Sequence, residues 1–200
     1  MTQKKTFTRN EAMTQTSSTY AITLYFDRDS TEKIRTLTAE LAGVTENDYM
    51  VRNSVPPHLT LGMFHAEDDQ EEKIKGLFKD FSDLAAKDVM ADGKLEVDFS
   101  GVESFLDKVI FIKPEKNGVL CKLNRTLHDV FLERFEPADN RNYLPENWYP
   151  HIALAVKLTH DQFERGMEFL NASALPKKAP IISLGLAICN PYTSLKEVNF

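Results

Sequence analysis

Hydrophobic positions along this 200-residue chain follow two spacings, every second residue in some segments and every three to four residues in others. The first spacing is typical of half-buried strands and the second of amphipathic helices. These segments follow one another as strand, helix, strand, helix, strand, and the order then repeats with one strand added at the end. The expected strands are 20–26, 58–64, 95–101, 108–112, 151–156, 180–189 and 194–200, and the expected helices are 29–43, 68–84, 115–135 and 159–170.

Polar residues mark the ends of several segments. Asp29 is followed three residues later by Glu32, and Thr159 by Gln162, which is the spacing of a capping box at a helix start. Asn190-Pro191 separates the last two apolar segments and predicts a hairpin turn there. The mixture of strands and helices indicates an α+β protein.

A short motif occurs twice, once in each half of this order. Pro57-His58-Leu59-Thr60 recurs as Pro150-His151-Ile152-Ala153, and each copy opens an alternating apolar strand. Side chains on a strand alternate between its two faces, so both histidines should point away from the packed face. The residues expected to share those faces are His58, Thr60, Gly62 and Phe64 in the first copy, and His151, Ala153 and Ala155 in the second.

The duplication predicts two similar lobes of β-α-β-α-β type, about 20–103 and 104–200, related by a pseudo-two-fold axis. Such an arrangement would bring the two histidine strands together across a central cleft. No Gly/Ser-rich linker divides the halves, so we expect one domain over 20–200. The irregular loop 136–149, directly before the second motif, is a candidate substrate lid or a surface crossing.

Composition narrows the function classes. The chain is 42% hydrophobic, which suffices for a substantial core, and it has no apolar run long enough for a membrane span. Its net charge of -6 argues against tight binding along long nucleic acids, but a small nucleotide or an RNA end remains a suitable partner. Cys121 and Cys189 are too isolated for a disulfide framework, so a reducing cytoplasm is the expected location. We also expect a monomer. Residues 1–19 are polar and are expected to form a disordered tail.

Two histidines on one cleft suit acid–base chemistry at phosphorus. One imidazole can take a proton from the nucleophile while the other protonates the leaving oxygen, because the ordinary pKa lies near 6.5. Thr60 shares the face of His58, and its hydroxyl can donate to a phosphate oxygen; Ala153 has no hydroxyl. One such bond contributes about 1.5–3 kcal/mol, or roughly tenfold to a hundredfold in rate. This chemistry requires no metal or other cofactor, and no third histidine or cysteine shares the face.

The paired histidine motifs and the duplicated element order resemble the two-histidine phosphoesterase superfamily, which includes 2'-5' RNA ligase-like proteins and cyclic phosphodiesterases. That family carries His-x-Thr or His-x-Ser in each lobe; His58-Leu59-Thr60 matches, whereas His151-Ile152-Ala153 lacks the hydroxyl. The resemblance implies a cleft between antiparallel sheets, a catalytic pair of His58 and His151, and phosphate binding by Thr60. It also implies a metal-independent hydrolase that acts on a 2',3'-cyclic phosphate or a 2'-5' phosphodiester. The alternatives are a noncatalytic module that binds a nucleotide or RNA end, and a protein-interaction scaffold.

Other residues near the motifs are weaker candidates. Trp148 and Tyr149 precede the second motif and could stack on a base, although loop packing explains them equally well. Arg52 precedes the first motif and could contact a phosphate, or lie in a solvated loop. His128 on a helix flank and His160 near a helix start are expected at the surface.

Overall fold

The computed structural model describes residues 17–92 and 95–200. Most of the expected tail, residues 1–16, lies outside the described residues. Ser17, Ser18 and Thr19 already belong to the first strand, which therefore begins three residues earlier than expected. Across the described ranges, no helix is long and apolar enough to cross a membrane.

The strands form one antiparallel sheet in the order β5-β2-β1-β7-β3-β4-β6, with β8 paired to β7. The hairpin expected at Asn190-Pro191 is the β7–β8 connection. The strands span β1 Ser17–Phe26, β2 His58–Glu67, β3 Glu96–Phe105, β4 Val109–Pro114, β5 Glu136–Pro137, β6 Ile152–Val156, β7 Lys178–Ile188 and β8 Thr193–Asn199.

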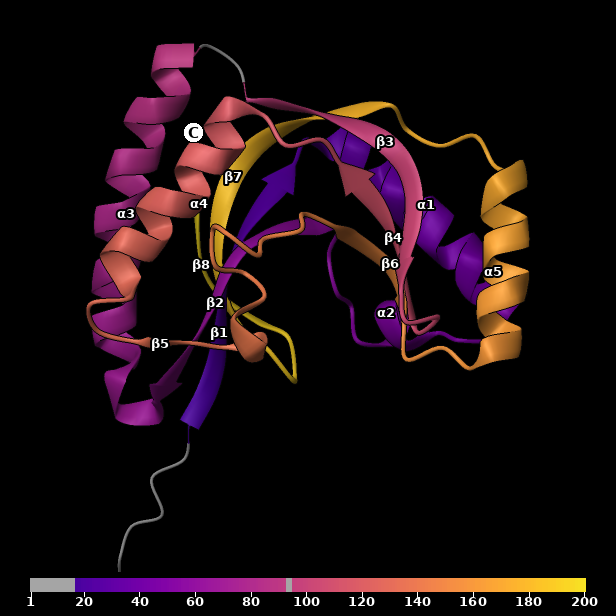
Figure 1. The fold of residues 1–200 in the computed structure, drawn as a ribbon, viewed down its shortest axis with the longest axis horizontal. Helices are drawn as coiled ribbons and strands as arrows, with labels where there is room; N and C mark the ends of the chain where they lie inside the picture. The colour runs from indigo at the N-terminus through magenta and orange to yellow at the C-terminus, as the bar shows by residue number, and fades with distance from the viewer. Residues whose placement is uncertain (1–16, 93–94) are drawn as a thin grey trace, which may run out of the picture.

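Two pairs of helices lie at opposite ends of this curved sheet (Figure 1). Helices α3 and α4 pack together beside β2, and α1 and α5 pack together beside β4 and β6. The helices span α1 Arg28–Thr45, α2 Tyr49–Arg52, α3 Glu71–Asp92, α4 Gly118–Phe131 and α5 His160–Ala172, with short 3-10 helices η1 at Asp68–Gln70 and η2 at Asp139–Arg141.

The two helix pairs, with the strands they pack against, do not follow the expected division of the chain near residue 103. Helix α1, from the first half, packs on α5 and β6 of the second half, while α4, from the second half, packs on α3 and β2 of the first. Strands β3 and β4 pair as a hairpin across the expected boundary. The apolar stripe of a helix specifies that one face is buried, but it does not specify which strand that face meets. The spacing of hydrophobic residues therefore could not predict that α1 packs with the second half and α4 with the first.

The ends of α1, α4 and α5 fall within four residues of expectation, whereas α3 continues to Asp92, eight residues beyond its expected end. Thr159 and Gln162 form the expected capping box of α5. At α1, however, the N-cap is Asp27 rather than Asp29: the Asp27 Oδ1 accepts a hydrogen bond from the Ser30 backbone N–H at 3.0 Å. Asp29 lies in the first turn, where its charge suits the helix dipole.

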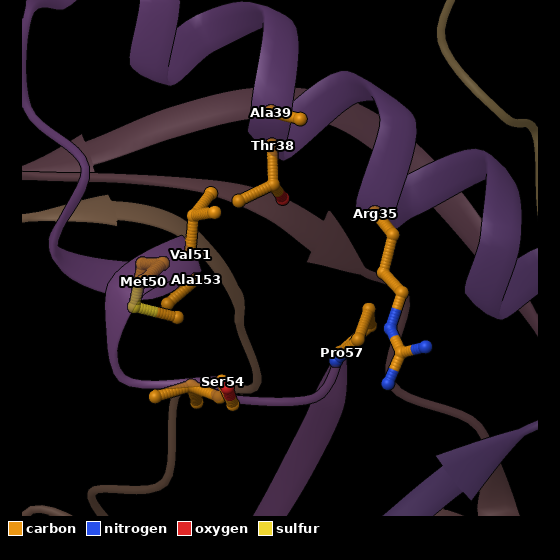
Figure 2. Close-up of a pocket in the computed structure, with 9 residues that line it drawn as sticks. Arg35, Thr38, Ala39, Met50, Val51, Ser54, Pro57 and Ala153 are labelled. Atoms are coloured by element: carbon orange, nitrogen blue, oxygen red, sulfur yellow. The ribbon is translucent and has the colours of Figure 1, made fainter.

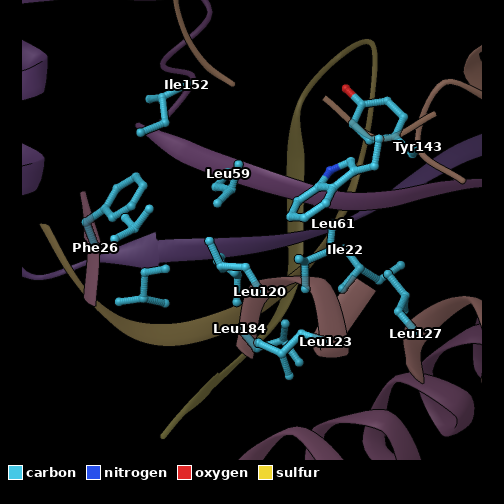
Figure 3. Close-up of a cluster of buried hydrophobic side chains, with 14 of the residues drawn as sticks. Ile22, Phe26, Leu59, Leu61, Leu120, Leu123, Leu127, Tyr143, Ile152 and Leu184 are labelled. Atoms are coloured by element: carbon cyan, nitrogen blue, oxygen red, sulfur yellow. The ribbon is translucent and has the colours of Figure 1, made fainter. Parts of the chain in front are cut away.

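One continuous apolar core includes residues from both helix pairs and from the sheet, and Figure 3 shows part of it. Leu59 and Ile152, the residues that follow the two histidines, are both fully buried in it. Burial of such a side chain contributes about 1.5–3 kcal/mol. The core therefore fixes the backbone of both motifs from the side opposite the histidines.

Candidate active site between the two histidine motifs

The two histidines are held in the same way. The His58 Nδ1 lies 2.7 Å from the Pro56 carbonyl oxygen, and the His151 Nδ1 lies 2.9 Å from the Tyr149 carbonyl oxygen. In a neutral ring, the nitrogen that faces a carbonyl carries the proton, so the lone pair is on Nε2. Both Nε2 atoms are thus prepared to accept a proton and, once protonated, to donate it.

Each motif is followed by a β-bulge at the equivalent leucine. In the β1–β2 ladder, Thr60 and Gly62 face consecutive residues of β1, so Leu61 is the extra residue. In the β4–β6 ladder, Ala153 and Ala155 face consecutive residues of β4, so Leu154 is the extra residue. Both leucines stand three positions after their histidine, and the internal duplication therefore extends to backbone geometry.

The bulges correct the expected face of several residues, because one extra residue reverses the alternation that follows it. Phe64 is fully buried and stacks on Phe131 of α4, with ring centroids 4.8 Å apart. Gly62 also faces α4, where an added Cβ would lie 2.8 Å from Leu127 Cδ2. Ala155 is likewise a core residue. Only the residues before each bulge keep the predicted face.

Burial and proximity set the charge of the pair. Desolvation by burial lowers the pKa of His58, the Pro56 carbonyl opposes this effect, and the nearby His151 lowers the pKa further. Burial also lowers the pKa of His151, against the opposing effects of the Tyr149 carbonyl and Asp139. The two motifs lie on strands β2 and β6, which are in contact. Both lowered pKa values favour neutral rings at neutral pH.

Trp148 and Asn124 hold the backbone at Thr60 and at its neighbour Leu61. The Trp148 indole N–H donates to the Thr60 carbonyl oxygen at 3.0 Å, and its side chain is only 2% exposed. Of the two alternatives for Trp148, base stacking and loop packing, the structure shows packing, because the ring is buried in the core. Asn124 of α4 donates through Nδ2 to the carbonyl oxygens of Leu61 at 2.7 Å and Tyr143 at 3.0 Å.

Tyr143 is a site residue that the sequence analysis missed. It lies in the irregular segment before the second motif, with its ring centroid 6.1 Å from that of His151. Its hydroxyl interacts with the Thr60 side chain, and burial raises its pKa, so the phenol stays protonated at neutral pH. The signal in the sequence was an aromatic residue in the polar loop that leads into His151.

Two tyrosines, Tyr192 and Tyr25, lie beside His58. The Tyr192 ring, in the β7–β8 connection, stacks on His58 with centroids 6.3 Å apart at 26°. Its hydroxyl lies 2.6 Å from that of Tyr25, which is directly opposite His58 in the β1–β2 ladder. Tyr25 lies across Gly185 of β7, where a Cβ atom would be 2.2 Å from the Tyr25 ring.

Two of the cavities near the site meet at Ala153. The larger, about 700 Å³, is lined by His151, Tyr143, Phe105 and Tyr149 among others. Tyr149 is 38% exposed, its hydroxyl donates to Glu103, and Lys113 lies 5.4 Å from its ring centroid. The smaller cavity, about 360 Å³, lies between α1 and α2 and includes Arg35, Thr38 and Pro57 (Figure 2). Ala153 lines both cavities, so its small side chain leaves them adjacent.

The remaining candidates lie outside the site. Arg52 is not a lining residue of either cavity and pairs with Asp48 at 3.6 Å on α2, so the structure lends no support to a phosphate contact. His160 is at the surface, near Asp107 and Glu164, as expected. His128 is not: it is 2% exposed, packed against Phe64, so its expected surface position was wrong. In the two described ranges, no group of three or more His, Cys, Asp or Glu side chains could hold a metal ion.

Comparisons with known proteins concern the family and the fold. Residues 52–188 match the model of the 2'-5' RNA ligase superfamily. The fold is similar to that of apo LigT from E. coli, with a TM-score of 0.51 and 16% identity over 92% of this chain and 98% of that one. Usb1 from Kluyveromyces marxianus, solved with uridine monophosphate, has a TM-score of 0.44 and 12% identity over 91% and 97% of the two chains. No match was found among curated proteins. At these identities the likeness to LigT establishes the fold alone.

Proposed function

The chain belongs to the 2'-5' RNA ligase superfamily, and from this premise we propose that it is a metal-independent phosphoesterase acting on a 2',3'-cyclic phosphate or a 2'-5' phosphodiester. Its substrate would be an RNA end or a small nucleotide. The observation that carries the proposal is the matched placement of His58 and His151, each with Nδ1 on a backbone carbonyl, at the start of β2 and directly before β6, two strands that are in contact. Thr60, on the His58 face, would donate to the phosphate.

The proposed hydrolysis divides two proton transfers between the histidines. The neutral ring accepts a proton from water through Nε2 as the water oxygen bonds to phosphorus. The protonated ring gives its proton to the ribose oxygen as the bond between that oxygen and phosphorus breaks. Burial of the two rings disfavours imidazolium, whereas a bound phosphate anion favours it. Substrate binding would thus create the one-proton state that the reaction needs.

The surroundings support a nucleotide-sized substrate. The cavity of about 700 Å³ beside His151 carries the exposed face of Tyr149, which could stack on a base. Arg35, in the cavity on the other side of Ala153, could pair with an additional phosphate. Space on both sides of Ala153 suits a diester with a substituent on each side.

The test is turnover of 2',3'-cyclic nucleotides, 2'-5' dinucleotides and short RNA ending in a cyclic phosphate, with a chelator present. His58→Ala and His151→Ala should each lower the rate by about 10²–10⁴, the usual contribution of a general acid or base. His65→Ala is the matched control, since His65 is exposed on the same strand and its Nδ1 faces Thr19 Oγ1 at 3.3 Å. Loss of turnover with chelator, or full activity of both cleft variants, would overturn the proposal.

A noncatalytic binding module is the second candidate, and the missing hydroxyl at Ala153 is the observation that favours it. Binding of uridine monophosphate that requires both histidines, without turnover of any member of the substrate panel, would support this function instead.

A further inference from the structure

The second motif lacks the hydroxyl that its counterpart carries. Thr60 follows His58 by two residues on the same face, whereas the equivalent residue after His151 is Ala153. A phosphoryl group under attack accumulates charge on its non-bridging oxygens, and donors placed there stabilise the transition state. If the proposed function holds, the His151 side of the cleft needs a donor from elsewhere in the chain.

Tyr143 lies where such a donor would act. It lines the same cavity as His151 and Ala153, and its ring is tilted at 36° to the His151 ring at a centroid distance of 6.1 Å. Its hydroxyl interacts with the Thr60 side chain of the opposite motif. One phenol therefore adjoins both the hydroxyl of the first motif and the histidine of the second.

The backbone that carries Tyr143 is tied to the first motif by a buried side chain. Asn124 is 1% exposed, and its Nδ2 donates to the Tyr143 carbonyl oxygen and to that of Leu61, the residue next to Thr60. A fixed donor needs no reorganisation during the reaction. Asn124 is accordingly a positioning residue for both hydroxyls.

We propose that the Tyr143 hydroxyl supplies the phosphate-binding group that the second motif lacks at Ala153. This inference rests on the proposed phosphoesterase function and adds a substrate-contacting residue to it. On substrate binding, the phenol O–H donates to a non-bridging phosphate oxygen next to the one bound by Thr60. Because burial keeps the phenol protonated, it acts as a hydrogen-bond donor and not as a base.

The decisive variant is Tyr143→Phe, which removes one oxygen atom and keeps the ring. We expect kcat to fall by roughly tenfold to a hundredfold, the effect of losing one hydrogen bond to a charged group, with a smaller change in KM. Tyr20→Phe is the matched control, because Tyr20 is 1% exposed in the helix-packed core, remote from the motifs in the sheet register. It should keep kcat within about threefold, and thermal unfolding should show both variants folded.

Ala153→Ser provides a second test that leaves Tyr143 in place. In the Tyr143→Phe background the new hydroxyl should restore part of the lost kcat, and this gain should exceed any gain that Ala153→Ser produces in the wild-type background. A tenfold gain from Ala153→Ser alone would show that the donor position is empty in the native protein and would overturn the inference.

The outcomes separate this inference from the function on which it rests. Turnover that requires His58 and His151 but is unchanged by Tyr143→Phe would refute the role of Tyr143 and leave the phosphoesterase proposal intact. Turnover that survives loss of both histidines would refute the proposed function itself.

Discussion

Gly185→Ala is expected to disturb the support of His58 from a distance. An added Cβ would lie 2.2 Å from Cε2 of Tyr25 and 2.8 Å from its hydroxyl oxygen. Gly185 has no left-handed backbone conformation, so the change tests space alone. The Tyr25 ring must move, and with it the 2.6 Å contact to the Tyr192 hydroxyl and the stacking of Tyr192 on His58.

The size of the effect follows from the cost of overpacking. Forcing one extra methyl group into a filled site costs about 1–3 kcal/mol. For a chain of this length, each kcal/mol lowers Tm by roughly 2–4 °C, so a decrease of about 2–12 °C is expected. Because the displaced aromatic pair packs on His58, kcat/KM for the cyclic phosphate substrate should also fall.

Thermal unfolding followed by circular dichroism measures the stability change, and a double-mutant cycle assigns it. In a Tyr25→Ala background the clash is gone, so Gly185→Ala should be neutral or should stabilise the strand by about 0.5–1 kcal/mol. Gly76→Ala is the control: nothing lies within 4 Å of its Cβ position, and alanine favours the α3 helix, so Tm should rise. An unchanged Tm in Gly185→Ala, or an equal loss in both backgrounds, would refute the reasoning.

Two further predictions concern buried polar groups near the site. Burial lowers the pKa of His128, against the opposing effects of the Asn124 carbonyl, Glu146 and Asp129. The unfolded chain thus binds more protons below about pH 6.5, and stability should fall as the pH drops from 7 to 5. Because His128→Leu removes this uptake, urea unfolding should show a smaller loss over that range; an equal loss would contradict the assignment. Asn124→Ala leaves two buried carbonyl groups without their donor, which costs about 1–3 kcal/mol of stability for each group. The variant should therefore have a lower Tm and a lower kcat. A lower Tm with an unaltered kcat would argue against the positioning role of Asn124.

The local elements and the candidate histidine pair could be predicted from the amino-acid sequence alone. Period-two and period-3.6 spacings located the strands and helices because burial of one face dictates them. The repeated Pro-His context identified His58 and His151, and the equivalent carbonyl contacts and bulges show that the two copies share local geometry. In this chain the repeated motif therefore has the same backbone geometry in both copies.

Which distant segments meet became apparent in the folded structure alone. The exchange of α1 and α4 between the two ends of the sheet depends on complementary packing, which a helix stripe does not encode. The bulges at Leu61 and Leu154 reverse the faces that simple alternation assigns, because an extra residue leaves no mark in hydrophobicity. Tyr143 adjoins Thr60 and His151 only because the folded loop is tied to β2, so contacts between residues far apart in the chain complete the site.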